Sequence, residues 1–302
     1  MSGPILALKV DVDTDLGTRD GVPALVNLFR ERNIPATFLF SLGPDNTGKA
    51  IRRIFRPGFL KKVKRTKVGS TYPWRTLLSG TVLPAPHIGK RRKSILRNVR
   101  DLGFECGIHC YDHFKWQDYV HHFDLEHTRR EFGKAVEEFI RIFEVQPLSA
   151  GAPGWQTNEK TLQVYDENNL LYGSDTRGFK PFLPRYGEAE FKTLQIPTTL
   201  PTLDELLGRP EFPDKSIPSY YTNCLRTDLP NVWTIHAEVE GQAYAGLFLR
   251  ILEVLVEKGI EFKTVEQIAA QSISQVNGLE RNEIADFELD GRSGLVANQI
   301  IA

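Results

Sequence analysis

The chain has 302 residues, of which 41% are hydrophobic and 25% are charged, and its 38 basic residues balance its 38 acidic ones. This composition is ordinary for a soluble globular protein that buries a large core. No segment has the roughly 20 consecutive apolar residues that span a bilayer, and the N-terminus lacks the pattern of a secretion signal. We therefore expect a cytoplasmic protein whose three cysteines are reduced thiols.

Apolar strands alternate with amphipathic helices along the chain. Strands are predicted at residues 6–10, 36–40, 104–108, 147–150, 231–236 and 261–263. Helices are predicted at residues 21–32, 125–143, 157–168 and 242–257. This alternation predicts an α/β fold with a mostly parallel sheet, and the number of units favours a distorted or incomplete (β/α) barrel. We expect a catalytic domain over residues 1–270, with a basic insertion at 43–100, and a C-terminal tail over 271–302 of unknown role.

The insertion after the second strand carries much of the positive charge. Residues 46–100 contain 16 Lys or Arg residues and no Asp or Glu, so the rest of the chain has 22 basic against 38 acidic residues, a net charge of −16. A segment with many basic and no acidic residues usually binds an anionic partner. The alternative is a solvated insertion without a partner. Apolar side chains such as Phe55, Phe59 and Trp74 are interleaved with the cations, which favours a membrane surface over a small satellite core.

Two aspartates close the first strand. In a parallel α/β fold, ligands collect at the C-terminal ends of the strands, where Asp11 and Asp13 are expected. Being two positions apart, they share a face if the strand continues, so one carboxylate can bind a metal while the other accepts a proton. The alternative is that one of them caps the following helix.

Two histidines follow the third strand. His109 and His113 are four positions apart, a spacing that puts both on one side of a helical turn. Two neutral imidazoles and one carboxylate make a ligand set for a divalent cation. The alternative is a chance pair on a polar loop.

A third histidine, His236, ends the strand at 231–236. Asp175 is a candidate to orient it, while the neighbouring Arg177 allows the alternative of a structural ion pair between Asp175 and Arg177. Taken together, the strand ends supply two nitrogens and one oxygen for a metal, a spare carboxylate and a separate histidine. This set suits metal-assisted hydrolysis, in which the metal activates water and polarises a carbonyl, a carboxylate acts as base and a histidine as acid.

In this order the residues resemble the signatures of the polysaccharide deacetylase superfamily, also known as the NodB-homology or carbohydrate esterase 4 superfamily. The matching stretches are Asp11 to Asp13, His109 to His113, Ala150 to Trp155, Ser174 to Arg177 and Thr234 to His236. The resemblance implies the following roles: metal ligands Asp13, His109 and His113; base Asp11; acid His236, oriented by Asp175; and substrate contacts Pro153, Trp155 and Glu238. It also implies one divalent ion, with zinc as the first expectation and manganese, cobalt or iron as alternatives.

Two departures from the superfamily pattern concern the base. Val12 separates the two aspartates, which are adjacent in many members. The arginine of the third signature is missing, with Gly151 near its place, and Arg177 is our candidate for the cation that replaces it beside the base.

Longer stretches resemble one subfamily, the bacterial deformylases of 4-deoxy-4-formamido-L-arabinose-phosphoundecaprenol. These stretches are DVDT, GTRDGVP, SLGPDN, SAGAPGW, GSDTRG, QIPTTLPTLDELLGR and TIHAEVEG. The resemblance implies hydrolysis of a linear amide bond in the aminoarabinose modification of lipid A, which gives polymyxin resistance. It implies a polyprenyl-phosphate substrate and peripheral contact with the cytoplasmic face of the inner membrane through residues 46–100. The alternatives are an N-deacetylase of another amino sugar and a non-catalytic lipid-phosphate binding protein.

Overall fold

The computed structural model describes residues 3–50, 78–274, 279–292 and 294–301. Its centre is an eight-stranded parallel sheet. Seven strands follow the order β10-β1-β2-β3-β4-β5-β8, and the eighth, β9, also pairs with β1. The strands are β1 (Ile5–Val12), β2 (Thr37–Ser41), β3 (Glu105–Cys110), β4 (Ser149–Ala150), β5 (Tyr172–Gly173), β8 (Leu194–Gln195), β9 (Asn231–His236) and β10 (Glu261–Lys263). The predicted strands are thus present, several of them shifted by one or two residues.

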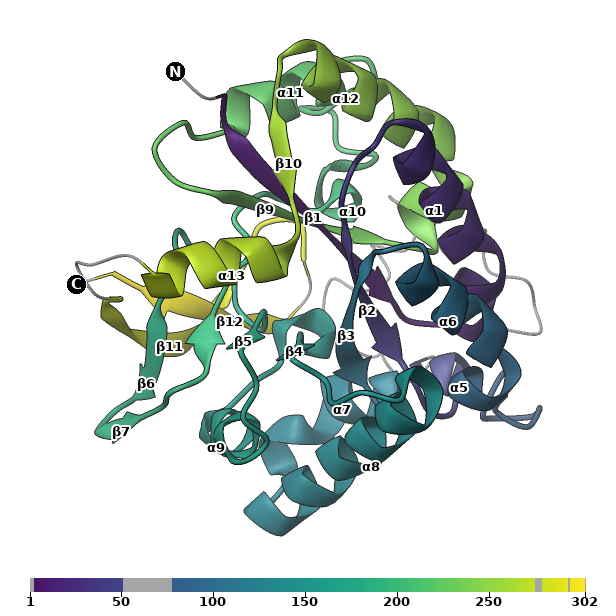
Figure 1. Cartoon of the computed structure of the whole chain (residues 1–302), viewed down its shortest axis with the longest axis vertical. Helices are drawn as coiled ribbons and strands as arrows, with labels where there is room; N and C mark the ends of the chain where they lie inside the picture. The colour runs from purple at the N-terminus through teal and green to yellow at the C-terminus, as the bar shows by residue number, and fades with distance from the viewer. Residues whose placement is uncertain (1–2, 51–77, 275–278, 293, 302) are drawn as a thin grey trace.

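Helices cover the outside of this sheet (Figure 1). They are α1 (Val22–Glu31), α5 (Ile88–Arg91), α6 (Lys93–Asp101), α7 (His113–Tyr119), α8 (Leu125–Phe143), α9 (Glu159–Glu167), α10 (Leu203–Leu206), α11 (Ile217–Cys224), α12 (Ala245–Glu257) and α13 (Val265–Ser274). Short turns of other helix types are η1 (Gly17–Gly21), η3 (Val120–His122), η4 (Pro153–Trp155) and η5 (Val239–Ala243). Neighbouring helices α1, α6, α8 and α9 pack side by side in chain order, as expected when each strand is followed by a crossover helix.

The sequence of α8 illustrates why these elements form. Asp124 accepts a hydrogen bond from the backbone N–H of His127 and so caps the helix start, and Glu144 ends the helix in the left-handed conformation at φ 62°. Between them, Phe132 and Phe139 are buried on the side that faces the sheet. The predicted bounds of this helix are confirmed.

The sheet curls into an incomplete barrel. Irregular backbone, not a strand, joins its last strand to β9. The segment after β8 reaches β9, where the N–H of Thr199 donates to the carbonyl of Val232 at 3.0 Å and the hydroxyls of Thr198 and Thr234 lie 2.7 Å apart. The predicted fold class is therefore confirmed, and the C-terminal ends of β1, β3 and β9 meet at one edge of the barrel.

Regular elements lie across both predicted domain boundaries, which stay predictions. α13 runs across residue 270, and β11 (Arg281–Glu288) and β12 (Leu295–Ile300) form a second sheet with β6 (Leu183–Tyr186) and β7 (Ala189–Glu190). Within residues 43–100, α5 and α6 belong to the crossover from β2 to β3. Residues 51–77, with Phe55, Phe59 and Trp74, lie outside the described residues.

All three cysteines are free thiols, as expected. None of the helices within the described ranges combines the length and apolar character needed to cross a bilayer.

Candidate active site

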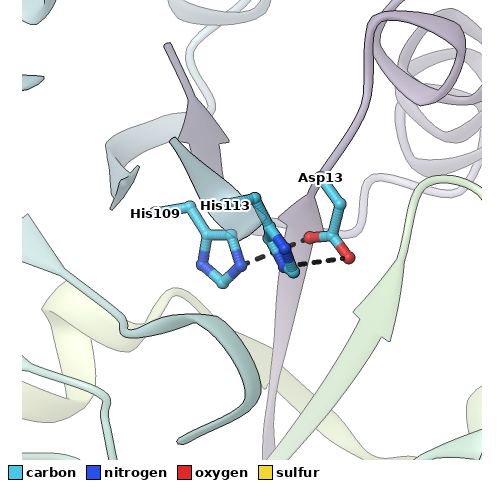
Figure 2. Close-up of side chains that lie close together, drawn as sticks. All are labelled: Asp13, His109 and His113. Carbon is cyan, nitrogen blue, oxygen red and sulfur yellow. Dashed lines mark ion pairs between the residues drawn. The ribbon is translucent and has the colours of Figure 1, made fainter. Parts of the chain in front are cut away.

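Three side chains that are far apart in sequence meet at the C-terminal edge of the barrel. Figure 2 shows the imidazoles of His109 and His113 turned toward the carboxylate of Asp13. The distance from His109 Nε2 to Asp13 Oδ1 is 3.3 Å, and that from His113 Nε2 to Asp13 Oδ2 is 3.4 Å. One ligand atom from each residue lies within 4.8 Å of the others, which is the grouping expected of a metal site.

The backbone around Asp13 is held by a buried carboxylate. Glu238 Oε1 accepts hydrogen bonds from the N–H groups of Asp13 and Thr14 and from the Thr14 hydroxyl, at 3.1, 2.9 and 2.8 Å. The Thr14 hydroxyl in turn accepts from the N–H of Gly17. Burial, together with the charge of Asp13, raises the pKa of Glu238 to about 8. This network fixes the turn after β1 and so the direction of the Asp13 side chain.

The two histidines do not share a helical turn, contrary to the prediction. His109 belongs to β3, whereas His113 is the first residue of α7. Asp112 caps that helix by accepting from the N–H of Lys115 at 3.0 Å, and Asn46 donates to the other oxygen of Asp112 at 2.6 Å. A strand end and a capped helix start therefore bring the two rings together.

The donor atoms around Asp13 fit a cation. Nδ1 of His109 lies 2.6 Å from the carbonyl oxygen of Gly151, and because a carbonyl only accepts, Nδ1 carries the proton. A neutral His109 then turns the lone pair of Nε2 toward Asp13 Oδ1, a buried atom without a hydrogen-bond partner in the described parts of the chain. Two facing lone pairs require a cation between them, which a metal ion or an added proton supplies.

The pKa shifts of Asp13 and His109 also favour a cation between them. Burial alone would raise the pKa of Asp13, but the charges of His113 and His109 outweigh it and hold this pKa well below its ordinary value. Burial likewise opposes a positive charge on His109, yet the carboxylates of Asp11 and Asp13 raise its pKa. A raised pKa of His109 means that protons compete with a metal for its Nε2, so metal affinity should fall at acidic pH.

Asp11 and His236 lie beside each other next to this centre. They are paired in register where β1 meets β9. Asp11 is only 4% exposed, and its Oδ1 has no hydrogen-bond partner within the described residues, while Lys9 Nζ lies 3.7 Å from its Oδ2. His236 is half-buried, and its backbone N–H donates to Glu240 Oε2 at 2.8 Å.

The carboxylate of Asp175 holds the loop after β4. It accepts hydrogen bonds from the N–H of Ala152 at 2.6 Å, from Gln195 at 2.9 Å and from the hydroxyl of Tyr165 at 3.1 Å. Burial raises its pKa to about 6 although these donors and the charge of Lys9 lower it. None of its hydrogen bonds within the described residues goes to His236, so the role of Asp175 in orienting that histidine stays a prediction.

Arg177 forms no ion pair with Asp11 among the described residues, so its role at the base stays a prediction. Its guanidinium donates to Glu205 of α10 at 2.8 Å and to the carbonyl of Leu200 at 3.0 Å, and it stacks on the ring of Trp155 with 5.0 Å to the centroid. The cation at Asp11 is Lys9, which the prediction missed.

The three residues predicted to contact substrate are all buried. Trp155 is 2% exposed, and its indole N–H donates to Thr198 at 3.1 Å. Pro153 is buried in the same turn, and Glu238 is 3% exposed beneath the Asp13 loop. Because little of these side chains is exposed, direct contact with substrate stays a prediction for them.

The sequence signal that could have revealed Lys9 is a lysine inside the apolar run ILALKVDV.

Comparisons with known proteins identify the family and the fold of the chain. No protein-family model matches the chain. It is 37% identical over 97% of its length to a probable 4-deoxy-4-formamido-L-arabinose-phosphoundecaprenol deformylase, ArnD, of Shewanella sediminis, and the match covers 94% of that protein. A protein with the same name from Wigglesworthia glossinidia brevipalpis is 32% identical over 94% of this chain and 98% of its own.

Among solved structures, a probable polysaccharide deacetylase from Pseudomonas aeruginosa superposes with a TM-score of 0.61 at 16% identity, over 91% of this chain and 93% of the other. This likeness concerns the fold, which is that of the NodB-type deacetylases. The sequence identity to the curated relatives, over nearly the whole of each chain, goes further. The chain belongs to the ArnD family of probable 4-deoxy-4-formamido-L-arabinose-phosphoundecaprenol deformylases.

Proposed function

We propose that this protein is a metal-dependent hydrolase that removes formate from undecaprenyl-phosphate-linked 4-formamido-4-deoxy-L-arabinose, in the aminoarabinose modification of lipid A. The observation that carries the proposal is the convergence of Asp13, His109 and His113 within 4.8 Å, with Asp11 and His236 alongside. The relatives named for this reaction support the choice of substrate. The products are formate and the lipid-linked amino sugar.

The metal-binding residues are Asp13, His109 and His113. When bound there, a divalent ion, with zinc as our first choice, would supply Lewis acidity toward the formyl oxygen and toward water. The Gly151 carbonyl orients the ring of His109, and Glu238 orients the loop of Asp13, so both ligands are held before the ion arrives.

The proton transfers fall to Asp11 and His236. Asp11 accepts a proton from the water that adds to the formyl carbon, and its Oδ1, which lacks a hydrogen-bond partner in the described chain, is the atom available for this. His236 gives a proton to the sugar nitrogen as the C–N bond breaks. The two side chains are neighbours in register, so they lie on the same stretch of the barrel edge without being bonded to each other.

The substrate places its phosphate at a membrane surface, and we propose that residues 46–100 bring the enzyme there. The 16 cations of this segment support the proposal, since each basic side chain near an anionic surface contributes about 1 kcal/mol. In the described part of the segment, Lys90 and Arg91 are exposed and Val82 is 76% exposed. The proposed place of action is the cytoplasmic face of the inner membrane.

The deciding experiment measures formate release from the lipid-linked formamido sugar, and acetate release from its acetamido counterpart, with the metal-loaded protein. We expect turnover of the formyl substrate. Preferred turnover of the acetyl substrate would replace the proposal with an N-deacetylase, and binding of the lipid without turnover would replace it with a binding protein. Sedimentation with vesicles of anionic or zwitterionic lipid tests the membrane contact separately.

A further inference from the structure

A lysine is buried in the middle of the first strand. Lys9 is 1% exposed, and a cation in such a place is rare unless it is paired, because removal from water is costly. Its ammonium donates to the carbonyl of Ser174 at 3.1 Å, lies 3.7 Å from Asp11 Oδ2 and lies 5.7 Å from the centre of the Trp155 ring. The side chain therefore bridges β1 and the segment after β5.

The strand puts Lys9 and Asp11 on one face, because side chains two positions apart point the same way. The two oxygens of Asp11 then differ. Oδ2 faces the ammonium, whereas Oδ1 is buried without a hydrogen-bond partner among the described residues. A carboxylate held through one oxygen leaves the other in a fixed direction.

The space beside Asp11 accounts for the glycine at the position of the missing arginine. A Cβ atom on Gly151 would lie 2.5 Å from Leu39 Cδ1 and 3.6 Å from Lys9 Nζ. A side chain at this position would therefore require Leu39 to shift, and the second distance shows that the Lys9 ammonium lies next to the same place. The cation is thus supplied by β1 instead of by the loop after β4.

The other buried cations nearby have different partners. Arg177 and Arg292 both donate to Glu205, at 2.8 and 3.3 Å, and they lie on the ring of Trp155 at 5.0 and 4.4 Å from its centroid. In the part of the chain that the structure describes, Lys9 is the cation paired with Asp11.

We propose that Lys9 is the positioning residue of the base: it holds Oδ2 of Asp11 so that Oδ1 faces the reacting water. This inference rests on the proposed function, in which Asp11 is the base. Lys9 acts through Asp11 and does not touch the substrate.

The test is a cycle of Lys9→Met, Asp11→Asn and the double variant, with Lys9→Arg as the conservative replacement. Methionine keeps the volume and removes the charge. We expect Lys9→Met to bind metal, to lose about 100-fold in kcat with little change in KM, and Lys9→Arg to recover most of the loss. Because Lys9 acts through Asp11, the double variant should be no slower than Asp11→Asn alone. Lys180→Met, which removes a lysine paired with Glu280, is the matched control and should keep full activity.

Full kcat in Lys9→Met, or losses that multiply in the double variant, would overturn the inference. The same four proteins also form a cycle in thermal stability, which needs no substrate. There, Lys9→Met should be less stable than the double variant, since only the single variant leaves a buried carboxylate without its cation. Additive stability changes would overturn the pairing of Lys9 with Asp11. Absence of turnover in the wild type would overturn the proposed function, and the stability cycle would still test the pairing.

Discussion

Two clusters of buried charge lie near the Trp155 ring, and they are built differently. In one, Glu205 accepts from Arg177, from Arg292 and from the N–H of Thr202, so its oxygens are well supplied with donors. In the other, Asp11 has one cation at 3.7 Å and an oxygen with no hydrogen-bond partner in the described chain. A fully satisfied network stabilises the fold, while a partly satisfied one keeps atoms available for chemistry. Mutation of the Glu205 cluster should therefore change stability but not activity, whereas mutation of the Asp11 cluster should change activity.

The largest effect should come from the metal ligand. We expect Asp13→Asn to lose bound metal and to lower formate release by about 10⁴-fold, because the remaining imidazoles lack the carboxylate that completes the set. Elemental analysis and the formate assay measure the two losses. Full metal content in a folded Asp13→Asn protein would contradict the ligand assignment.

The next effect separates the base from the metal. Asp11→Asn should keep its metal and lower kcat by about 10³-fold, the size of a typical general-base contribution. The substitution also leaves the Lys9 ammonium buried without its carboxylate, so the unfolding free energy should fall as well. An active Asp11→Asn protein would show that another group accepts the proton.

The satisfied cluster should give the opposite result. Glu205→Ala leaves Arg177 and Arg292 buried without their carboxylate, which should cost about 3 kcal/mol of unfolding free energy. Metal content and kcat of the folded protein should change little. Chemical denaturation beside the formate assay makes the comparison, and a Glu205→Ala protein that is stable but inactive would reverse the roles of the two clusters.

The smallest effect is a dependence on pH. Burial raises the pKa of Glu240 from 4.5 to about 8, so the folded state holds a proton that the unfolded state releases. Stability from this group is therefore present below pH 4.5 and is lost as pH rises toward 8. Glu240→Gln should flatten the fall in melting temperature over this range. An unchanged slope would show that other groups, such as Asp175, dominate it.

The sequence predicted the positions of the ionisable groups better than their partners. Asp11, His109 and His236 were found because apolar runs mark buried strands, and parallel strands bring their C-terminal ends to one edge. The partners of Asp175 and Arg177 depend on side-chain directions across the barrel, which periodicity does not contain. Lys9 could have been found from its place inside the apolar run ILALKVDV, two positions before Asp11, although its bond to Ser174, 165 positions away, could not.

The second sheet was missed for a related reason. β11 pairs with β6, almost a hundred residues earlier in the chain, and neither strand shows a strong apolar pattern by itself. Their pairing joins two distant segments into one sheet, so local sequence could not reveal it.

The C-terminal hairpin has a practical consequence for anyone who shortens this protein. Gly291, at φ 84°, lets the turn before β12 press against the backbone of α10, where a Cβ would lie 2.6 Å from the carbonyl oxygen of Glu205. Next to this contact, Arg292 lies over the indole of Trp155 at 4.4 Å from the ring centroid, and Lys9 lies 5.7 Å from the same centroid. Trimming the last twenty residues would thus uncover the ring that backs the site, and tags are better attached at the other terminus.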